Sequence, residues 1–165
     1  MLLGGIVLTL GYLGQLVVTV FTYRAASLSA LQNAGWLILY LSALFGWWPM
    51  FTLRKWGGVA AGKSYVQTSR LVDRGPYAIV RHPQYTAGIL LAIGLTLLSQ
   101  HWLAAVLGLI AAAATIHGMT AEEEGCVEKF GAAYIDYAEK VPRMNLLTGT
   151  VRWLRRRTHR GSASR

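Results

Sequence analysis

Four apolar segments dominate the pattern of hydrophobic and polar positions along the chain. They cover residues 2–22, 34–53, 83–99 and 102–119, and an α-helix of about 20 residues crosses the hydrocarbon core of a bilayer. Inside lipid a segment must pair its own backbone N–H and C=O groups, which favours helices. The pattern therefore predicts an all-α fold, a polytopic membrane helix bundle of about four transmembrane helices within a single domain over residues 1–165.

The third segment needs a closer definition of its start. Its strictly apolar part, Thr86 to Leu98, is too short to span a bilayer, so the helix is expected to begin at Pro83, a residue suited to a first helical turn. Only residues 99–101 separate it from the fourth segment. Such a short link predicts a tight hairpin of two antiparallel helices.

The charged residues are distributed unevenly around these segments. Only 14% of the chain is charged. Of its 16 Lys and Arg residues, Arg24 alone lies between the first and second segments, six lie between Arg54 and Gln84, and nine lie after Met119. Because positively charged loops stay in the cytoplasm, both termini and residues 54–84 are predicted to be cytoplasmic. All seven acidic residues lie in the same two regions, so polar chemistry is expected on that face.

The region after the fourth segment has a different periodicity. Between Glu122 and Val141 the apolar positions recur at alternating intervals of three and four, the period of one helix face; they are Val127, Phe130, Tyr134, Tyr137 and Val141. A cytoplasmic amphipathic helix is therefore predicted there.

The last residues, Val151 to Arg165, mix apolar side chains with five arginines before residue 161. This composition suits the anionic headgroups of membrane lipids. Nucleic acid is the competing partner for a basic run, but in a membrane protein a lipid partner is favoured and no nucleic acid is expected.

Two groups of polar residues could carry chemistry. Arg81 and His82 precede Pro83 at the start of a predicted helix, where free N–H groups and the helix dipole favour an anion. Glu122, Glu123 and Glu124 follow the fourth segment, and the hairpin would return them to the same level. Together the groups suit a zwitterionic ligand, with Glu124 expected mainly to start the cytoplasmic helix. The histidines and the single cysteine have no metal-site spacing.

Three strings in this order resemble a known family: GPYAIVRHPQYTAG at 75–88, the pair Glu122 and Glu123, and FGAAYIDYAEKVPR at 130–143. They are similar to the isoprenylcysteine carboxyl methyltransferase and phospholipid N-methyltransferase superfamily, whose pattern is RHPxY, a later Glu pair, and FG seven residues beyond it. Upstream, Arg54, Gly62 and Tyr65 resemble a further set of family positions. The resemblance covers residues 54–143, with Gly125 as a departure that is expected to loosen the start of the cytoplasmic helix.

This resemblance implies an enzyme, a membrane methyltransferase that uses S-adenosyl-L-methionine (SAM) and takes a lipophilic acceptor from the bilayer. The acceptor would be a prenylcysteine-like carboxylate or a phospholipid amine headgroup. By family position Arg54 would be catalytic and orient the acceptor. The implied cofactor contacts are Tyr77, Arg81, His82, Pro83, Tyr85, Glu122 and Glu123, and the implied substrate contacts are Tyr134, Tyr137 and Arg143.

Two other functions remain open at this point. Membrane sterol reductases, which use NADPH, also resemble this region, although GPY at 75–77 and the small size of the chain speak against them. A non-catalytic lipid-binding scaffold is the third interpretation.

Overall fold

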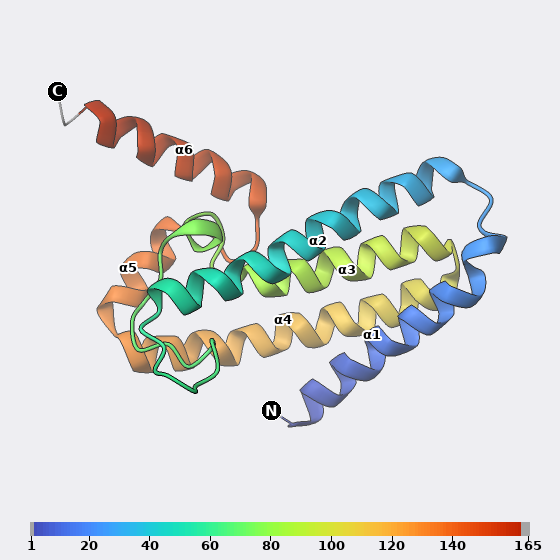
Figure 1. The fold of residues 1–165 in the computed structure, drawn as a ribbon, viewed down its shortest axis with the longest axis horizontal. Helices are drawn as coiled ribbons and strands as arrows, with labels where there is room; N and C mark the ends of the chain where they lie inside the picture. The colour runs from blue at the N-terminus through green and yellow to red at the C-terminus, as the bar shows by residue number, and fades with distance from the viewer. Residues whose placement is uncertain (1, 163–165) are drawn as a thin grey trace. The chain divides into compact units, whose positions relative to one another are not determined.

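The computed structural model describes residues 2–162, and the side chains of residues 4–158. It is helical, and the described residues contain no strand. Figure 1 shows the six α-helices. They are α1 (Leu2–Thr22), α2 (Ser29–Trp56), α3 (Pro83–Ser99), α4 (Trp102–Phe130), α5 (Ala132–Lys140) and α6 (Leu146–Ser162), with short 3₁₀ helices η1 (Tyr23–Ala25) and η2 (Gly75–Ala78).

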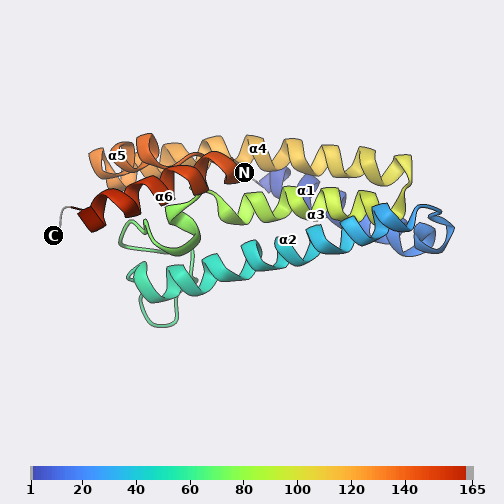
Figure 2. The ribbon, with the colours of Figure 1, turned by 90° about the horizontal axis from the view of Figure 1, so that it is seen from above.

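The predicted helical membrane fold is confirmed. α1 has the predicted ends, α3 begins at Pro83, and α3 and α4 are joined by two residues, of which Gln100 has a positive φ of 49°. α2 is longer than its apolar segment at both ends. In Figures 1 and 2 α3 and α4 run side by side in opposite directions.

The single amphipathic helix predicted over 122–141 was wrong. α4 continues without a break from Trp102 to Phe130, and α5 begins only after Gly131, whose φ of +57° lies in the left-handed region. Glycine adopts this conformation without a steric penalty, so the chain turns there. The expected loosening at Gly125 was also wrong, because one glycine inside a helix costs only about 1 kcal/mol.

The chain is an integral membrane protein by its helices. α1, α2 and α4 are long and apolar enough to cross a bilayer, whereas α3 is an apolar helix of 17 residues. At about 1.5 Å per residue, α3 has a length near the lower limit for a membrane span.

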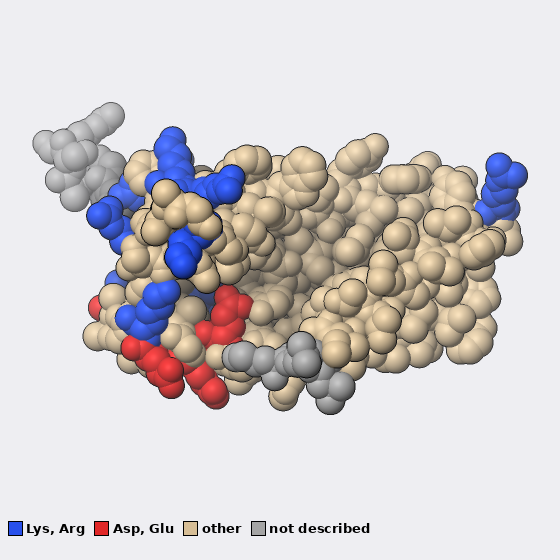
Figure 3. Space-filling view, turned by 60° about the horizontal axis from the view of Figure 1, so that its bottom comes forward, with Lys and Arg blue, Asp and Glu red and all other residues tan. Residues whose placement is uncertain are grey.

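The chain divides into two compact units. The apolar unit comprises Met1–Gly46 and Gln84–Glu122, and the charged unit comprises Trp47–Pro83 and Glu123–Arg165. The apolar unit contains one basic residue, Arg24, and one acidic residue, Glu122. Figure 3 accordingly shows large areas of surface without charge and a dense group of Lys, Arg, Asp and Glu side chains over one region.

Close backbone contacts and buried polar groups hold the apolar unit together. Gly35 of α2 lies against Gly94 of α3, and a Cβ added at Gly94 would lie 3.2 Å from the carbonyl oxygen of Gly35 and 2.6 Å from a methyl carbon of Leu39. Gln15 is fully buried and its amide donates to the Ala92 oxygen at 2.7 Å. Small residues and interhelical hydrogen bonds of this kind are the usual means of helix association in lipid.

We expect Gly94→Ala to lower the thermal unfolding midpoint in detergent. Ala favours a helix more than Gly does, but its methyl group would push α2 away from α3, and overpacking of this type costs about 1 to 3 kcal/mol. Gly125→Ala is the matched control, because it is also inside a helix and a Cβ there would meet nothing within 4 Å. Equal midpoints for the two variants would contradict the close contact.

Candidate functional site

The segment before α3 reaches its position through a tight turn and a short irregular stretch around the buried Val80. Gly75 begins η2 with a φ of +59°, and a Cβ there would lie 3.1 Å from the Thr52 hydroxyl of α2. Val80 is fully buried. The next two backbone N–H groups pair with the segment after α5: Arg81 donates to the Pro142 oxygen at 2.9 Å and His82 to the Arg143 oxygen at 3.1 Å.

This pairing places three basic side chains, those of Arg81, His82 and Arg143, around one carboxylate, that of Glu123 on α4. Its Oε1 atom lies 2.9 Å from His82 Nε2 and 3.2 Å from Arg81 Nη2, and its Oε2 atom lies 2.6 Å from Arg143 Nη2. The Glu123 and Arg81 side chains are only 10% and 12% exposed, whereas Arg143 is 51% exposed. We call these four residues the Glu123 cluster.

The cluster has an excess of positive charge. One carboxylate faces two guanidinium groups as well as the imidazole of His82, so at least one positive charge is not neutralised inside the cluster. Arg81 Nε is also buried without a hydrogen-bond partner among the described residues. Buried charged groups normally have an ion-pair or hydrogen-bond partner for each polar atom. The arrangement is therefore suited to an additional anion that reaches the arginines.

The sequence did not predict that the polar groups of the site bind one another, and their contacts with a ligand stay a prediction. The sequence suggested that His82 and Arg81 would receive the anionic end of a ligand and the Glu pair its cationic end. In the structure these groups bind one another, and Glu123 already has two guanidinium groups and the His82 imidazole as neighbours. A carboxylate in that setting has little attraction left for the ammonium group of a ligand.

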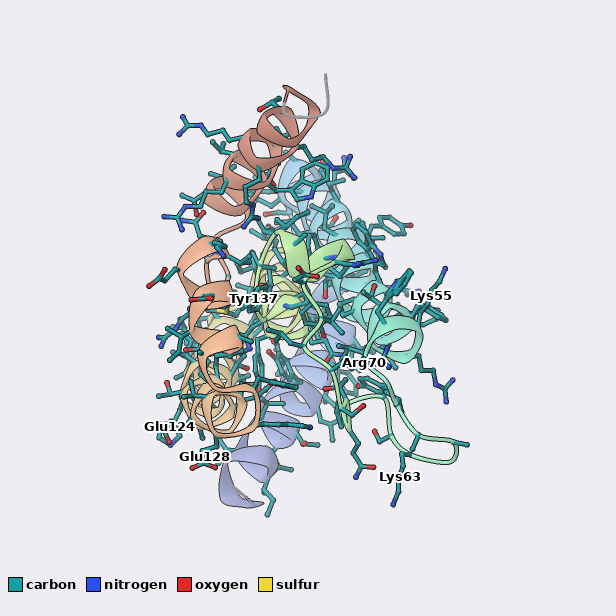
Figure 4. The ribbon with its side chains drawn as sticks, turned by 90° about the vertical axis from the view of Figure 1, so that its left-hand side faces the viewer. Lys55, Lys63, Arg70, Glu124, Glu128 and Tyr137 are labelled. Atoms are coloured by element: carbon teal, nitrogen blue, oxygen red, sulfur yellow. The ribbon has the colours of Figure 1, made fainter. Side chains whose placement is uncertain are left out.

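The two buried tyrosines of α5 support the segment that carries the cluster. Tyr134 and Tyr137 form a core with Val141, and the Tyr137 hydroxyl donates a hydrogen bond to the Tyr77 oxygen at 2.7 Å. Burial raises the pKa of Tyr137 well above its ordinary value, so the hydroxyl remains protonated and keeps donating. In Figure 4 Tyr137 lies on the side of α5 that faces the η2 segment. A substrate contact by either ring stays a prediction.

The other residues named from the sequence lie outside the cluster. Pro83 is buried at the start of α3, with Tyr85 half-buried in the same turn. Glu122 and Glu124 are exposed on α4, and Figure 4 shows Glu124 pointing outward. Arg54 is exposed in the last turn of α2 and forms no ion pair among the described residues. Their functional roles stay predictions.

Sequence reasoning missed the part that α6 plays beside the cluster. Gly149 packs so closely on the backbone of Ile79 that a methyl group at this position would collide with the Ile79 oxygen. The Arg156 guanidinium donates to the Ala78 oxygen at 2.7 Å and to the Lys140 oxygen at 3.0 Å. The signal in the sequence was Gly149, a glycine inside the first turns of a helix.

Comparison with known proteins gives one family. A family model described as phospholipid methyltransferase matches residues 30–133. This range includes the whole segment from Arg54 to Glu123 and ends at the start of α5. Neither the curated proteins nor the solved structures contain a match to the chain.

We expect Glu123→Gln to destabilise the protein by about 3 kcal/mol, since removing one partner of a buried ionic cluster leaves the others uncompensated. Here the uncompensated groups would be Arg81, His82 and Arg143. Glu124→Gln is the control. Glu124 is the next residue of the chain and is exposed, so this change should have little effect. Thermal unfolding of the two variants in the same detergent measures the difference, and equal losses would mean that the wrong glutamate has been placed in the cluster.

Proposed function

The chain belongs to the phospholipid methyltransferase family, and on this premise we propose that it transfers a methyl group from SAM to a lipophilic acceptor at the cytoplasmic face of the membrane. The observation that carries the proposal is the coincidence of the family match over 30–133 with the Glu123 cluster, three of whose four members fall inside that range. We place the site in the cytoplasm because fifteen of the sixteen basic residues lie in the regions that we predict to be cytoplasmic.

The acceptor that we favour is the amine headgroup of a phospholipid, following the description of the family. A prenylcysteine-like carboxylate is the other acceptor considered, because the RHP motif at Arg81, His82 and Pro83 resembles both branches of the superfamily equally. Either acceptor has a long apolar part, which suits a chain with three helices long and apolar enough to cross a bilayer.

The cluster fits the carboxylate at the methionyl end of SAM. Its net positive charge attracts an anion, and a guanidinium group can donate hydrogen bonds to two carboxylates because it has five N–H donors. Arg143, half-exposed, is the member with the most room for a ligand, and the buried Nε atom of Arg81 is a donor that still needs a partner. We assign cofactor binding to these two arginines, and to His82 the task of holding Glu123 in place.

When bound, SAM supplies an electrophilic methyl group on a sulfonium centre. The chain's own residues then have to align the acceptor with that group and exclude water, which accounts for most of the acceleration in a displacement of this kind. We do not assign Glu123 as a proton acceptor for an amine, because a carboxylate that binds two guanidinium groups and a histidine is a weak base. Arg54, exposed at the end of α2, is the candidate for orienting the headgroup.

Two measurements test the proposal. Purified protein should transfer label from radioactive SAM to phosphatidylethanolamine, with a prenylcysteine analogue as the competing acceptor. SAM at 100 times its dissociation constant should stabilise the fold by about 2.7 kcal/mol, and NADPH should not. Stabilisation by NADPH alone would favour the reductase alternative, and the absence of both transfer and stabilisation would favour the non-catalytic scaffold.

We expect Arg143→Gln to weaken SAM binding by about tenfold, since a charge-assisted hydrogen bond contributes roughly 1.5 kcal/mol or more. The cluster should survive this change because Glu123 keeps Arg81 and His82. Lys140→Gln is the control, as Lys140 is an exposed cation three residues earlier. Calorimetric titration measures both affinities. Unchanged SAM affinity with a raised KM for the lipid would move Arg143 from cofactor binding to substrate binding.

We expect Arg54→Ala to leave SAM affinity nearly unchanged and to slow transfer by about ten- to a thousandfold, the range for losing one orienting cation. Lys55→Ala, the neighbouring exposed cation in the same helical turn, is the matched control and should retain activity. Arg54→Lys should restore transfer if the contact is with a phosphate charge, and little if it is a bidentate contact with a carboxylate. Normal turnover of Arg54→Ala would remove this residue from the mechanism.

A further inference from the structure

The two sides of α6 are used differently. On one side Gly149 packs on the Ile79 backbone and Arg156 donates to the oxygens of Ala78 and Lys140. With 3.6 residues per turn, the row that starts at Leu147 lies on the opposite side of the helix. The helix therefore packs on the rest of the charged unit by one side, and its other side points away from these contacts.

The outward side carries an exposed apolar row. Leu147, Val151 and Leu154 are spaced by four and three residues, which places them on one face, and they are 82%, 48% and 51% exposed. None of the residues of this row contributes to the core of the charged unit. Three large aliphatic side chains in a row on a helix surface indicate that something else covers them.

Arginines border the row on both sides. Arg155 and Arg157 lie next to Leu154 on opposite sides of the face, both are exposed, and the Arg157 guanidinium stacks on the Trp153 ring at 4.3 Å. No acidic residue follows Glu139 in the chain. An apolar face with basic residues at its edges is the pattern of a helix that lies in the interface of a bilayer with anionic lipids.

We propose that α6 is an interfacial helix that binds anionic phospholipid, with Leu147, Val151 and Leu154 in the acyl-chain boundary and Arg155 and Arg157 on the headgroup phosphates. The membrane is the partner that we choose because this chain is itself anchored in a bilayer, so anionic lipid is always within reach. A nucleic acid would match the arginines but would leave the apolar row uncovered.

The side of α6 that carries Gly149 and Arg156 places the proposed lipid-binding helix beside the Glu123 cluster. The carbonyl oxygen that accepts from Arg156 belongs to Ala78, three residues before Arg81, and Gly149 contacts the residue after Ala78. A lipid-bound α6 would thus hold the η2 segment through its backbone. The lipid-binding surface itself does not depend on the proposed methyl transfer.

The test uses the full-length chain reconstituted into vesicles of phosphatidylcholine, with or without phosphatidylglycerol. In a Cys126→Ser background, Leu154→Cys is labelled with an environment-sensitive fluorophore and quenched by lipids that carry a nitroxide on the acyl chain. We expect strong quenching in the anionic vesicles, less in the neutral ones, and a loss of this difference at high salt, where surface charges are screened.

The charge requirement is tested by Arg155→Gln combined with Arg157→Gln. Each basic residue near an anionic surface contributes a factor of about five in binding, so the inserted fraction relative to the free one should fall about thirtyfold. The control is Lys63→Gln with Arg70→Gln, which removes two exposed cations from the loop after α2, labelled in Figure 4, and should leave the quenching unchanged. Quenching that is absent, or equal in the two kinds of vesicle, would overturn the proposal. That result is expected if a protein or a nucleic acid, and not lipid, is the partner of this face.

Discussion

The buried carboxylate of Glu123 is the constraint on which the charged unit depends. It binds Arg81 and His82 from the segment before α3 and Arg143 from the segment after α5. These three pieces are distant in the sequence, and a charge buried at this depth is tolerated only where its partners are held in place. The backbone hydrogen bonds from Arg81 and His82 to Pro142 and Arg143 supply that rigidity, and the hydroxyl of Tyr137 adds a third attachment at Tyr77.

The cost of burying a charge also explains why the charged residues are so unevenly distributed along the chain. Helices that cross lipid cannot carry ionised side chains without a large cost, and the apolar unit accordingly contains only Arg24 and Glu122. Its polar side chains, such as Gln15 and Ser42, bind backbone oxygens of neighbouring helices. The ionic chemistry is thereby confined to the ends of α2 and α4 and to the segments that follow them, which is where the Glu123 cluster forms.

The helices of the bundle were largely predictable from the sequence, because length and hydropathy decide them. Pro83 marked the start of α3, and the short link after Ser99 marked the hairpin. The continuation of α4 to Phe130 was not predictable, since Gly125 and Gly131 look alike in sequence and only the second adopts a positive φ. Which of three consecutive glutamates is buried depends on the rotation of that continuous helix. The contact of Gly149 with Ile79, which fixes α6, is a tertiary contact that the local pattern does not encode.

The mutual binding within the cluster bears on the ligand binding that we propose for its residues. His82 is the most buried member, at 4% exposure of its side chain, and its Nε2 atom lies 2.9 Å from Glu123 Oε1, which supports the positioning role proposed for it. By sharing Glu123 with the two arginines, it keeps the carboxylate at a fixed position between them. Arg143 connects the buried Glu123 with the surface, because its guanidinium lies 2.6 Å from the Glu123 carboxylate while half of the Arg143 side chain is exposed. An incoming anion would meet this guanidinium first. The negative charge of the anion would be balanced by the positive charge that the fold has already assembled in the cluster, so that little reorganisation is left for the moment of binding.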